Sequence, residues 1–321
     1  MTPAVLARAP LTYLTGAGPF AGPVVALTWG LLLVSVVVTV IVTGLVTAAI
    51  LSRRTRGRPV SEVPVKPSGD GLRWLWIGMA ASTVALVVSL VWTVAVLARI
   101  NAPATAPPLT IRVTGLQWWW RAIYQPDRPG ERFETANEIR IPAGVPVRVE
   151  LVGGDVIHSF WVPQLGGKTD TIPGRTNVMW LQADKPGRYA GQCAEYCGLQ
   201  HAKMSLTVIA MPPADFASWQ AAQRQAAVPD SSQTEGRALF AQRCAKCHAV
   251  RGTDAPGPTG PDLTHLMSRQ TLAAGAAPNI LGGLEGWIAN PQGVKPGALM
   301  PAALLAGPQL QAVSGYLETL R

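Results

Sequence analysis

Four cysteines, four histidines and seven methionines are the side chains of this 321-residue chain that suit transition-metal chemistry. One group of them forms Cys244-Ala-Lys-Cys247-His248, a C-x-x-C-H sequence. This pattern is typical of covalent c-type haem attachment, in which the thiols bind the vinyl groups and the histidine ligates iron. A thioredoxin-like dithiol is the alternative, but it needs a strand before the motif and a helix after it. Here a helical segment precedes Cys244 and a Gly/Pro-rich loop follows His248, so we predict haem.

A methionine downstream of the haem motif is expected to supply the second axial ligand. A thioether opposite histidine raises the reduction potential of the iron, which suits electron transfer. Met300, in Gly-Ala-Leu-Met-Pro, lies in a loop that can present its sulfur, whereas Met267 lies in a segment typical of a core helix. We therefore favour Met300 over Met267. The remaining histidine of this region, His265, is given no role.

The other two cysteines lie in a second group of soft ligands. Cys193, Cys197, His201 and Met204 follow one another at i, i+4, i+8 and i+11, and His158 lies 35 residues before Cys193. A disulfide would leave the histidine and the methionine without a function, and zinc has little use for a thioether. A mononuclear blue-copper site needs only one cysteine. Two cysteines with two histidines therefore indicate two copper ions bridged by both sulfurs.

Two uncharged apolar segments, residues 24–51 and 74–98, predict membrane-spanning helices, because each exceeds the roughly 20 residues that cross a bilayer. A cleaved signal peptide would carry its basic residues before the apolar segment, and here they follow it. The connecting loop contains Arg53, Arg54, Arg56, Arg58, Lys66 and Arg73 against Glu62 and Asp70. Such loops stay in the cytoplasm, so both termini are expected on the periplasmic side.

The net charge of +9 does not indicate a nucleic-acid partner, because two thirds of it lies within residues 1–106, around the apolar segments. After residue 106 the chain turns to short β-like segments separated by turn residues, at 109–114, 138–141, 145–151, 177–183 and 204–209. They predict a small all-β sandwich or barrel. A short helix at 215–227, a linker and a helical region from residue 234 follow.

Residues 107–211 resemble the copper domain of cytochrome c oxidase subunit II, and the helical hairpin before them fits the same family. Residues 234–321 resemble a small class I cytochrome c. The combination is similar to the caa type of haem–copper oxidase, in which cytochrome c is fused to subunit II. The resemblance implies a two-helix transmembrane hairpin (1–106), an all-β cupredoxin-like copper domain (107–213), a linker (214–233) and an all-α cytochrome c domain (234–321).

The same resemblance assigns residues to the copper site. It implies that a binuclear copper centre is held by one backbone carbonyl, that of Glu195, and by five side chains: His158, Cys193, Cys197, His201 and Met204. The Glu195 carboxylate would face a magnesium ion at the border with the catalytic subunit. Trp118, in Gln-Trp-Trp-Trp, takes the position at which electrons enter, although three tryptophans could also simply cover the barrel.

The loop at residues 168–177 resembles the one that faces the catalytic subunit, and a solvated turn is its alternative. One position departs from the family, which commonly has a glutamate before the second span at the mouth of a proton channel. Here Arg73 occupies that neighbourhood and Asp70 is the nearest acid.

The resemblance implies a subunit of cytochrome c oxidase, an oxidoreductase and translocase of a bacterial-type inner membrane. An external cytochrome c or another periplasmic donor would reduce the haem, and the electron would pass by the copper pair to subunit I, which reduces oxygen to water. Other oxidase subunits and membrane lipid are the expected contacts. A nitric oxide reductase-like relative could use the same copper centre. A copper-delivery assembly protein would lack His201, Met204 and the haem motif, and a quinol oxidase would lack the copper ligands.

Overall fold

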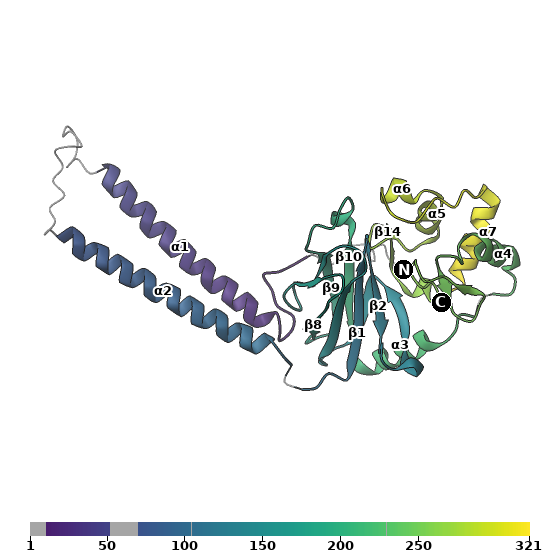
Figure 1. Cartoon of the computed structure of the whole chain (residues 1–321), viewed down its shortest axis with the longest axis horizontal. Coiled ribbons are helices and arrows are strands. Elements are labelled where there is room, and N and C mark those ends of the chain that lie inside the picture. Colours follow the sequence, from purple (N-terminus) through teal and green to yellow (C-terminus); the bar gives the residue numbers. More distant parts are fainter. Residues whose placement is uncertain (1–10, 52–69, 104, 229) are drawn as a thin grey trace. The chain divides into compact units, whose positions relative to one another are not determined.

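The computed structural model describes residues 11–51, 70–103, 105–228 and 230–321. These residues form two compact units, one of residues 23–102 and one of residues 11–22 and 103–321 (Figure 1). The arginine-rich loop at residues 53–58, with Glu62 and Lys66, lies outside the described residues.

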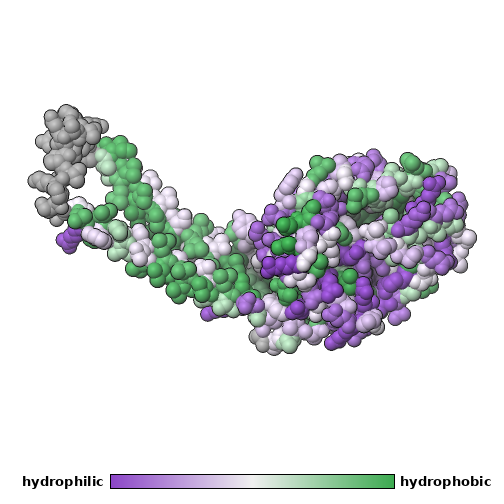
Figure 2. All heavy atoms as spheres, viewed as in Figure 1, coloured by the Kyte–Doolittle hydropathy of each residue, from purple (hydrophilic) through white to green (hydrophobic). Residues whose placement is uncertain are grey.

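The first unit consists of two long helices, α1 (Gly22–Leu51) and α2 (Asp70–Ile100). The most apolar 18-residue stretch has a mean hydropathy of 2.6 in α1 and 2.2 in α2. Of these stretches, 0% is buried in α1 and 6% in α2. Figure 2 shows hydrophobic residues over most of the visible surface of both helices. Helices that are apolar on all sides and this long can cross a bilayer. They contain both predicted spans, and α2 begins before Arg73 rather than after it.

The second unit begins with a sandwich of two five-stranded sheets. The first sheet contains, in spatial order, β3 (Phe133–Ala136), β2 (Trp119–Tyr124), β1 (Leu109–Leu116), β5 (Val147–Gly153) and β8 (Thr176–Leu181). The second contains β4 (Glu138–Pro142), β10 (Ser205–Met211), β9 (Gly187–Cys193), β6 (His158–Trp161) and β7 (Thr169–Thr171). Strands β1 and β5 are parallel, as are β4 and β10, and the other neighbouring strands are antiparallel.

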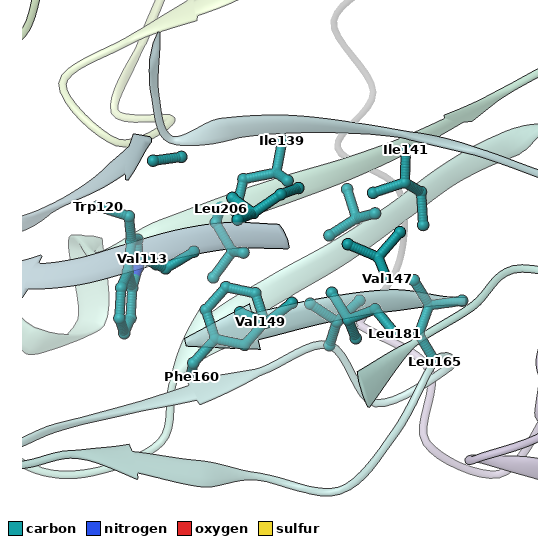
Figure 3. Close-up of a cluster of buried hydrophobic side chains, with 14 of the residues drawn as sticks. Val113, Trp120, Ile139, Ile141, Val147, Val149, Phe160, Leu165, Leu181 and Leu206 are labelled. Carbon is teal, nitrogen blue, oxygen red and sulfur yellow. The ribbon is translucent and has the colours of Figure 1, made fainter. Parts of the chain in front are cut away.

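The core of the sandwich lies between the two sheets. Along β1, buried and partly buried residues alternate, because successive side chains of a strand point to opposite faces. Val149 and Leu181 of the first sheet and Ile139 and Phe160 of the second point toward one another (Figure 3). The predicted all-β fold of this region is therefore confirmed.

Helix α3 (Pro213–Arg224) continues this β domain. Phe216 is 7% exposed and belongs to the sandwich core, and the Trp219 ring lies 5.4 Å from Tyr124 and 5.5 Å from Phe133. The first half of the expected linker, residues 214–233, is thus a packed helix.

The haem-motif domain contains the helices α4 (Thr234–Arg243), α5 (Leu281–Ala289), α6 (Pro291–Val294) and α7 (Gly307–Glu318). Helix α4 packs on α7 through the Phe240 and Tyr316 rings, whose centres are 5.4 Å apart. Two short hairpins add a little β structure to this helical domain: β11 (Ala249–Val250) with β12 (Ala255–Pro256), and β13 (Thr271–Leu272) with β14 (Ala277–Pro278). Short 3-10 turns are η4 (Pro129–Glu131), η5 (His201–Lys203) and η6 (Leu266–Ser268).

The haem-motif domain covers the outer edge of β4, the edge strand of the second sheet. Glu138, which is 4% exposed, accepts hydrogen bonds at Oε1 from the backbone N–H groups of Gln270 and Thr271, at 2.8 and 3.0 Å. Arg140 donates to the backbone oxygen of Ser268 at 2.8 Å. On the same edge, the backbone N–H and C=O of Arg140 pair with the Tyr124 hydroxyl at 2.7 and 2.8 Å, as an edge strand's outward backbone groups need partners.

Candidate copper and haem sites

Three neighbouring strands bring the predicted copper ligands to one end of the second sheet. His158 begins β6 and Cys193 ends β9, next to it in the sheet. Cys197 lies in the loop that follows, His201 begins η5, and Met204 directly precedes β10. The short loop between β9 and β10 therefore carries four of the ligands, and the pairing of β6 with β9 adds the fifth.

The donor atoms of these residues lie close together. His158, Cys193 and Cys197 are buried, with ligand atoms within 4.8 Å of one another. The Cys197 sulfur lies 3.8 Å from the Cys193 sulfur, 3.6 Å from Nδ1 of His201 and 3.8 Å from Sδ of Met204. A disulfide would bring the two sulfurs to about 2.05 Å, so both thiols are free.

The two thiols differ in pKa. The hydrogen bond between Cys193 and Cys197 lowers the pKa of Cys193, and the same contact together with burial raises the pKa of Cys197. A low thiol pKa favours the thiolate, which is the form that binds metals. Cys193 is also 3.2 Å from the backbone oxygen of Glu195, the carbonyl predicted as a ligand, while the Glu195 side chain is exposed.

His158 is oriented by an acid that the sequence analysis did not identify. Its Nε2 lies 2.8 Å from Oδ1 of Asp155, which also accepts from Val156 N–H, while Oδ2 accepts from Gln117 N–H. Nδ1 of His158 is buried and has no hydrogen-bond partner. A carboxylate that holds one imidazole nitrogen while the other faces a ligand site is the usual outer shell of a metal-binding histidine.

These residues fit a copper centre. Thiolate–metal bonds of about 2.3 Å allow two sulfurs 3.8 Å apart to share an ion. Two thiolates, two imidazoles, a thioether and a carbonyl are enough donors for two ions, and the soft sulfur donors favour copper. A bound ion would also satisfy Nδ1 of His158.

The three consecutive tryptophans have three different environments. Trp120 is fully buried in the sandwich core, and the Trp119 ring lies under the guanidinium of Arg121, 5.2 Å from its centre. Trp118 instead donates from Nε1 to the backbone oxygen of Cys197 at 2.9 Å. Trp120 is thus a core residue of the sandwich, whereas Trp118 contacts the backbone of a predicted copper ligand.

The C-x-x-C-H motif forms one turn after α4. The backbone N–H groups of Cys247 and His248 both donate to the oxygen of Cys244, at 3.0 Å. Nδ1 of His248 lies 2.8 Å from the oxygen of Pro261, which leaves Nε2 for iron. Burial lowers the pKa of His248 and so favours the neutral imidazole that binds iron. A Cβ at Gly260 would lie 2.6 Å from the imidazole, so only glycine allows this approach. These residues fit a haem iron.

Both candidate methionines lie partly buried against the core of this domain. The loop of Met300 is fixed by Gln292, which accepts from Gly297 N–H at 2.8 Å and donates to the oxygens of Ala298 and Met300 at 2.7 and 3.3 Å. Met267 lies in the 3-10 turn η6, rather than in the expected core helix. The choice of Met300 stays a prediction.

His265 has a structural place. Its ring nitrogens lie 2.6 Å from the Arg321 oxygen and 3.1 Å from the Gln225 oxygen, so it joins the chain end to the segment after α3. In the loop at 168–177, Asn177 donates to the oxygen of Asp170 at 2.8 Å, between β7 and β8.

Comparison with known proteins identifies the two domains separately. Residues 124–211 match the family described as cytochrome c oxidase subunit II, periplasmic domain, and residues 233–321 match the cytochrome c family. These families imply a copper centre in the first domain and a haem in the second.

Several relatives are named as subunit 2 of a cytochrome c oxidase. The cytochrome c oxidase subunit 2 of Alkalihalophilus pseudofirmus is 41% identical over 216 residues, which are 66% of this chain and 61% of the relative. The subunit 2 of Bacillus sp. PS3 is 33% identical over 227 residues, 66% of this chain and 62% of the relative. The solved periplasmic domain of subunit II of the Bradyrhizobium japonicum cytochrome oxidase is 35% identical and covers 38% of this chain and 97% of that one, with a TM-score of 0.36.

The chain therefore spans about three fifths of the length of the first two relatives. The chain thus combines an apolar hairpin with a β domain that matches the family of the periplasmic domain of cytochrome c oxidase subunit II and, at its C-terminal side, a domain that matches the cytochrome c family.

Proposed function

We propose that this chain is the subunit at which electrons enter a terminal cytochrome c oxidase. One observation carries the proposal: the copper donor set and the haem motif lie in one compact unit, and Trp118 touches the backbone of Cys197. When bound, the haem and the copper centre each accept and release one electron at a time. The chain itself holds these groups at fixed positions and buries the copper donors His158, Cys193 and Cys197.

The copper centre is proposed to be binuclear. Cys193 and Cys197, with the two histidines and Met204, would hold the ions through their side chains, and the Glu195 carbonyl would add one oxygen. Two observations support this assignment: the short contacts of the Cys197 sulfur with His201 and Met204, and the buried Nδ1 of His158, which has no hydrogen-bond partner. Asp155 keeps the His158 ring turned toward the sulfurs by holding its other nitrogen.

The haem is proposed to be attached covalently. Cys244 and Cys247 would supply the thiols, and His248, through Nε2, and Met300, through its sulfur, would hold the iron. The turn that presents all three motif side chains together, and the hydrogen bond of His248 to Pro261, support this assignment. Gln292 fixes the loop that carries Met300 and so limits the positions its sulfur can take.

The chain is a membrane protein with two spans, α1 and α2. We infer from the basic loop between them that the copper and haem domains face the periplasm. The catalytic subunit I and other oxidase subunits are the proposed partners, with the loop at 168–177 facing subunit I. A magnesium ion on the exposed Glu195 carboxylate belongs to that border. The electron donor is an external cytochrome c or another periplasmic protein.

The test uses the purified membrane complex. We expect a mixed-valence two-copper EPR signal, a c-type optical band, haem that stays on the chain in denaturing electrophoresis, and cyanide-sensitive oxygen uptake with a reduced cytochrome c. A mononuclear copper signal or loss of haem on denaturation would contradict the proposal. Nitric oxide uptake without oxygen uptake would instead favour the nitric oxide reductase-like alternative, which the names of the relatives do not support.

A further inference from the structure

A buried lysine joins the haem domain to the β domain beside Trp118. Lys295, directly after α6, is 2% exposed. Its Nζ donates to the backbone oxygens of Trp118 at 2.6 Å, Lys203 at 2.9 Å and Ala273 at 3.0 Å. An ammonium has three donors, and here each one faces a carbonyl oxygen.

The acceptors of this lysine come from both domains. Ala273 belongs to the haem domain, whereas Trp118 and Lys203 belong to the β domain, and Lys203 lies between two proposed copper ligands. Lys203 in turn donates from Nζ to the oxygen of Val294 at 2.9 Å. In each domain, one lysine thus donates a hydrogen bond to a backbone oxygen of the other domain. Burying an ammonium costs free energy unless all of its donors are hydrogen-bonded. The burial of Lys295 is therefore stable only while the two domains keep its three carbonyl acceptors within hydrogen-bond distance.

The segment that follows Lys295 lies on the Trp118 ring. A Cβ at Gly297 would be 3.3 Å from Cη2 of Trp118 and 3.2 Å from Leu199, and the φ of Gly297 is +83°, a conformation that favours glycine. The backbone at Gly297 therefore packs directly against the indole. Met300 lies three residues further along the same loop.

The other side of the indole faces the copper site. Nε1 of Trp118 donates to the oxygen of Cys197, and Nε2 of Gln117 donates to the same oxygen at 2.7 Å. A continuous path of bonds and contacts thus runs from the Met300 loop through Gly297 and the Trp118 ring to Cys197.

We propose that Lys295 is a positioning residue that holds the Met300 loop of the haem domain against the Trp118 ring. Single electrons then pass within one chain from the haem domain to the copper domain through this contact, with no bond made or broken. This inference rests on the proposed function. It also implies that an external donor reaches the haem domain and not Trp118, which is 8% exposed beneath the loop.

The test replaces Lys295 with methionine in the full chain, within the purified complex. K295M removes all three donors at a similar side-chain length. We expect faster hydrogen exchange in peptides spanning residues 116–119 and 295–300, and electron transfer from haem to copper slowed by about tenfold, since each 1.4 kcal/mol of lost contact is a factor of ten in the docked population. The copper EPR signal and the haem content should stay unchanged, and the two midpoint potentials are measured so that the rate is compared at equal driving force. K185M, at an exposed lysine of the β domain, is the matched control.

The outcomes separate this inference from the proposed function. A wild-type complex without c-type haem or without the two-copper signal refutes the proposed function, whatever the lysine does. A wild-type complex with both centres and a K295M complex with unchanged exchange and unchanged transfer rate overturns the role of Lys295. If K295M does not assemble, K203M takes its place: its lysine is exposed and loses one contact, so about a twofold to threefold slower transfer supports the inference and an unchanged rate overturns it.

Discussion

Replacing Asp155 should weaken copper binding, by an amount that depends on the replacement. The carboxylate holds three groups: Oδ1 lies 2.8 Å from Nε2 of His158 and 2.6 Å from Val156 N, and Oδ2 lies 2.6 Å from Gln117 N. An asparagine has one acceptor oxygen, so its NH₂ group must face an N–H donor on one side. The less costly orientation keeps the contact with His158 and gives up Gln117. Asp155→Ala gives up all three contacts.

We therefore expect D155N to lower copper affinity about tenfold and D155A to lower it about a hundredfold, which is the range for outer-shell partners of metal ligands. The assay is a competition titration of the full chain against a chelator of known copper affinity. D254A, at an exposed aspartate of the haem domain, should bind copper like the wild type. If D155A also retains the wild-type affinity, the orientation of His158 does not depend on this carboxylate and the reasoning is wrong.

Four further outcomes follow from the structure. Glu138→Ala should reduce the stability of the domain contact by about 3 kcal/mol, because it leaves the buried donors of residues 270 and 271 without an acceptor, and faster hydrogen exchange there is the readout. Phe216→Ala should cost about 3 to 5 kcal/mol in denaturant unfolding of the β domain; a change below 1 kcal/mol contradicts its place in the core. Met300→Leu should abolish the methionine–iron absorption band of oxidised haem, and Met267→Leu should keep it; the reverse result assigns the ligand to Met267. Burial raises the pKa of Glu134, so the folded state binds its proton more tightly and stability falls as pH rises from the ordinary carboxyl range through the raised value; Glu134→Gln should flatten this part of the profile in thermal unfolding.

The sequence allows candidate metal sites to be proposed because most of their expected ligands lie in short segments with restrictive chemistry. Cys193, Cys197, His201 and Met204 fit within one loop, so their spacing alone brings them together. His158 could be added because its residue type is rare in this chain. The transmembrane hairpin is equally local, since it depends only on two uncharged segments.

Other features depend on contacts between distant residues. Strand β9 (Gly187–Cys193) has two glycines and an arginine and no β-like alternation; it is a strand because β10 and β6 pair with it on either side. Asp155 resembles any turn aspartate until the fold brings Gln117 to it. Lys295 and Glu138 have the residue types of solvated charges. They are buried by contacts between the two domains with residues more than 100 positions away, Trp118 for Lys295 and Gln270 for Glu138.

The covered edge of β4 has a consequence for how the chain is made. The ribosome releases the β domain before the haem domain, so the Glu138 carboxylate and the Arg140 guanidinium on the outer edge of β4 lack these partners until residues 268–271 have been synthesised and folded, and only the Arg140 backbone is already paired, with the Tyr124 hydroxyl. An uncovered edge strand can pair with the edge of another copy. A newly made or truncated β domain is therefore exposed to aggregation during this interval, and the haem domain acts for its neighbour as a late-arriving protective cap, in addition to any part it takes in electron transfer.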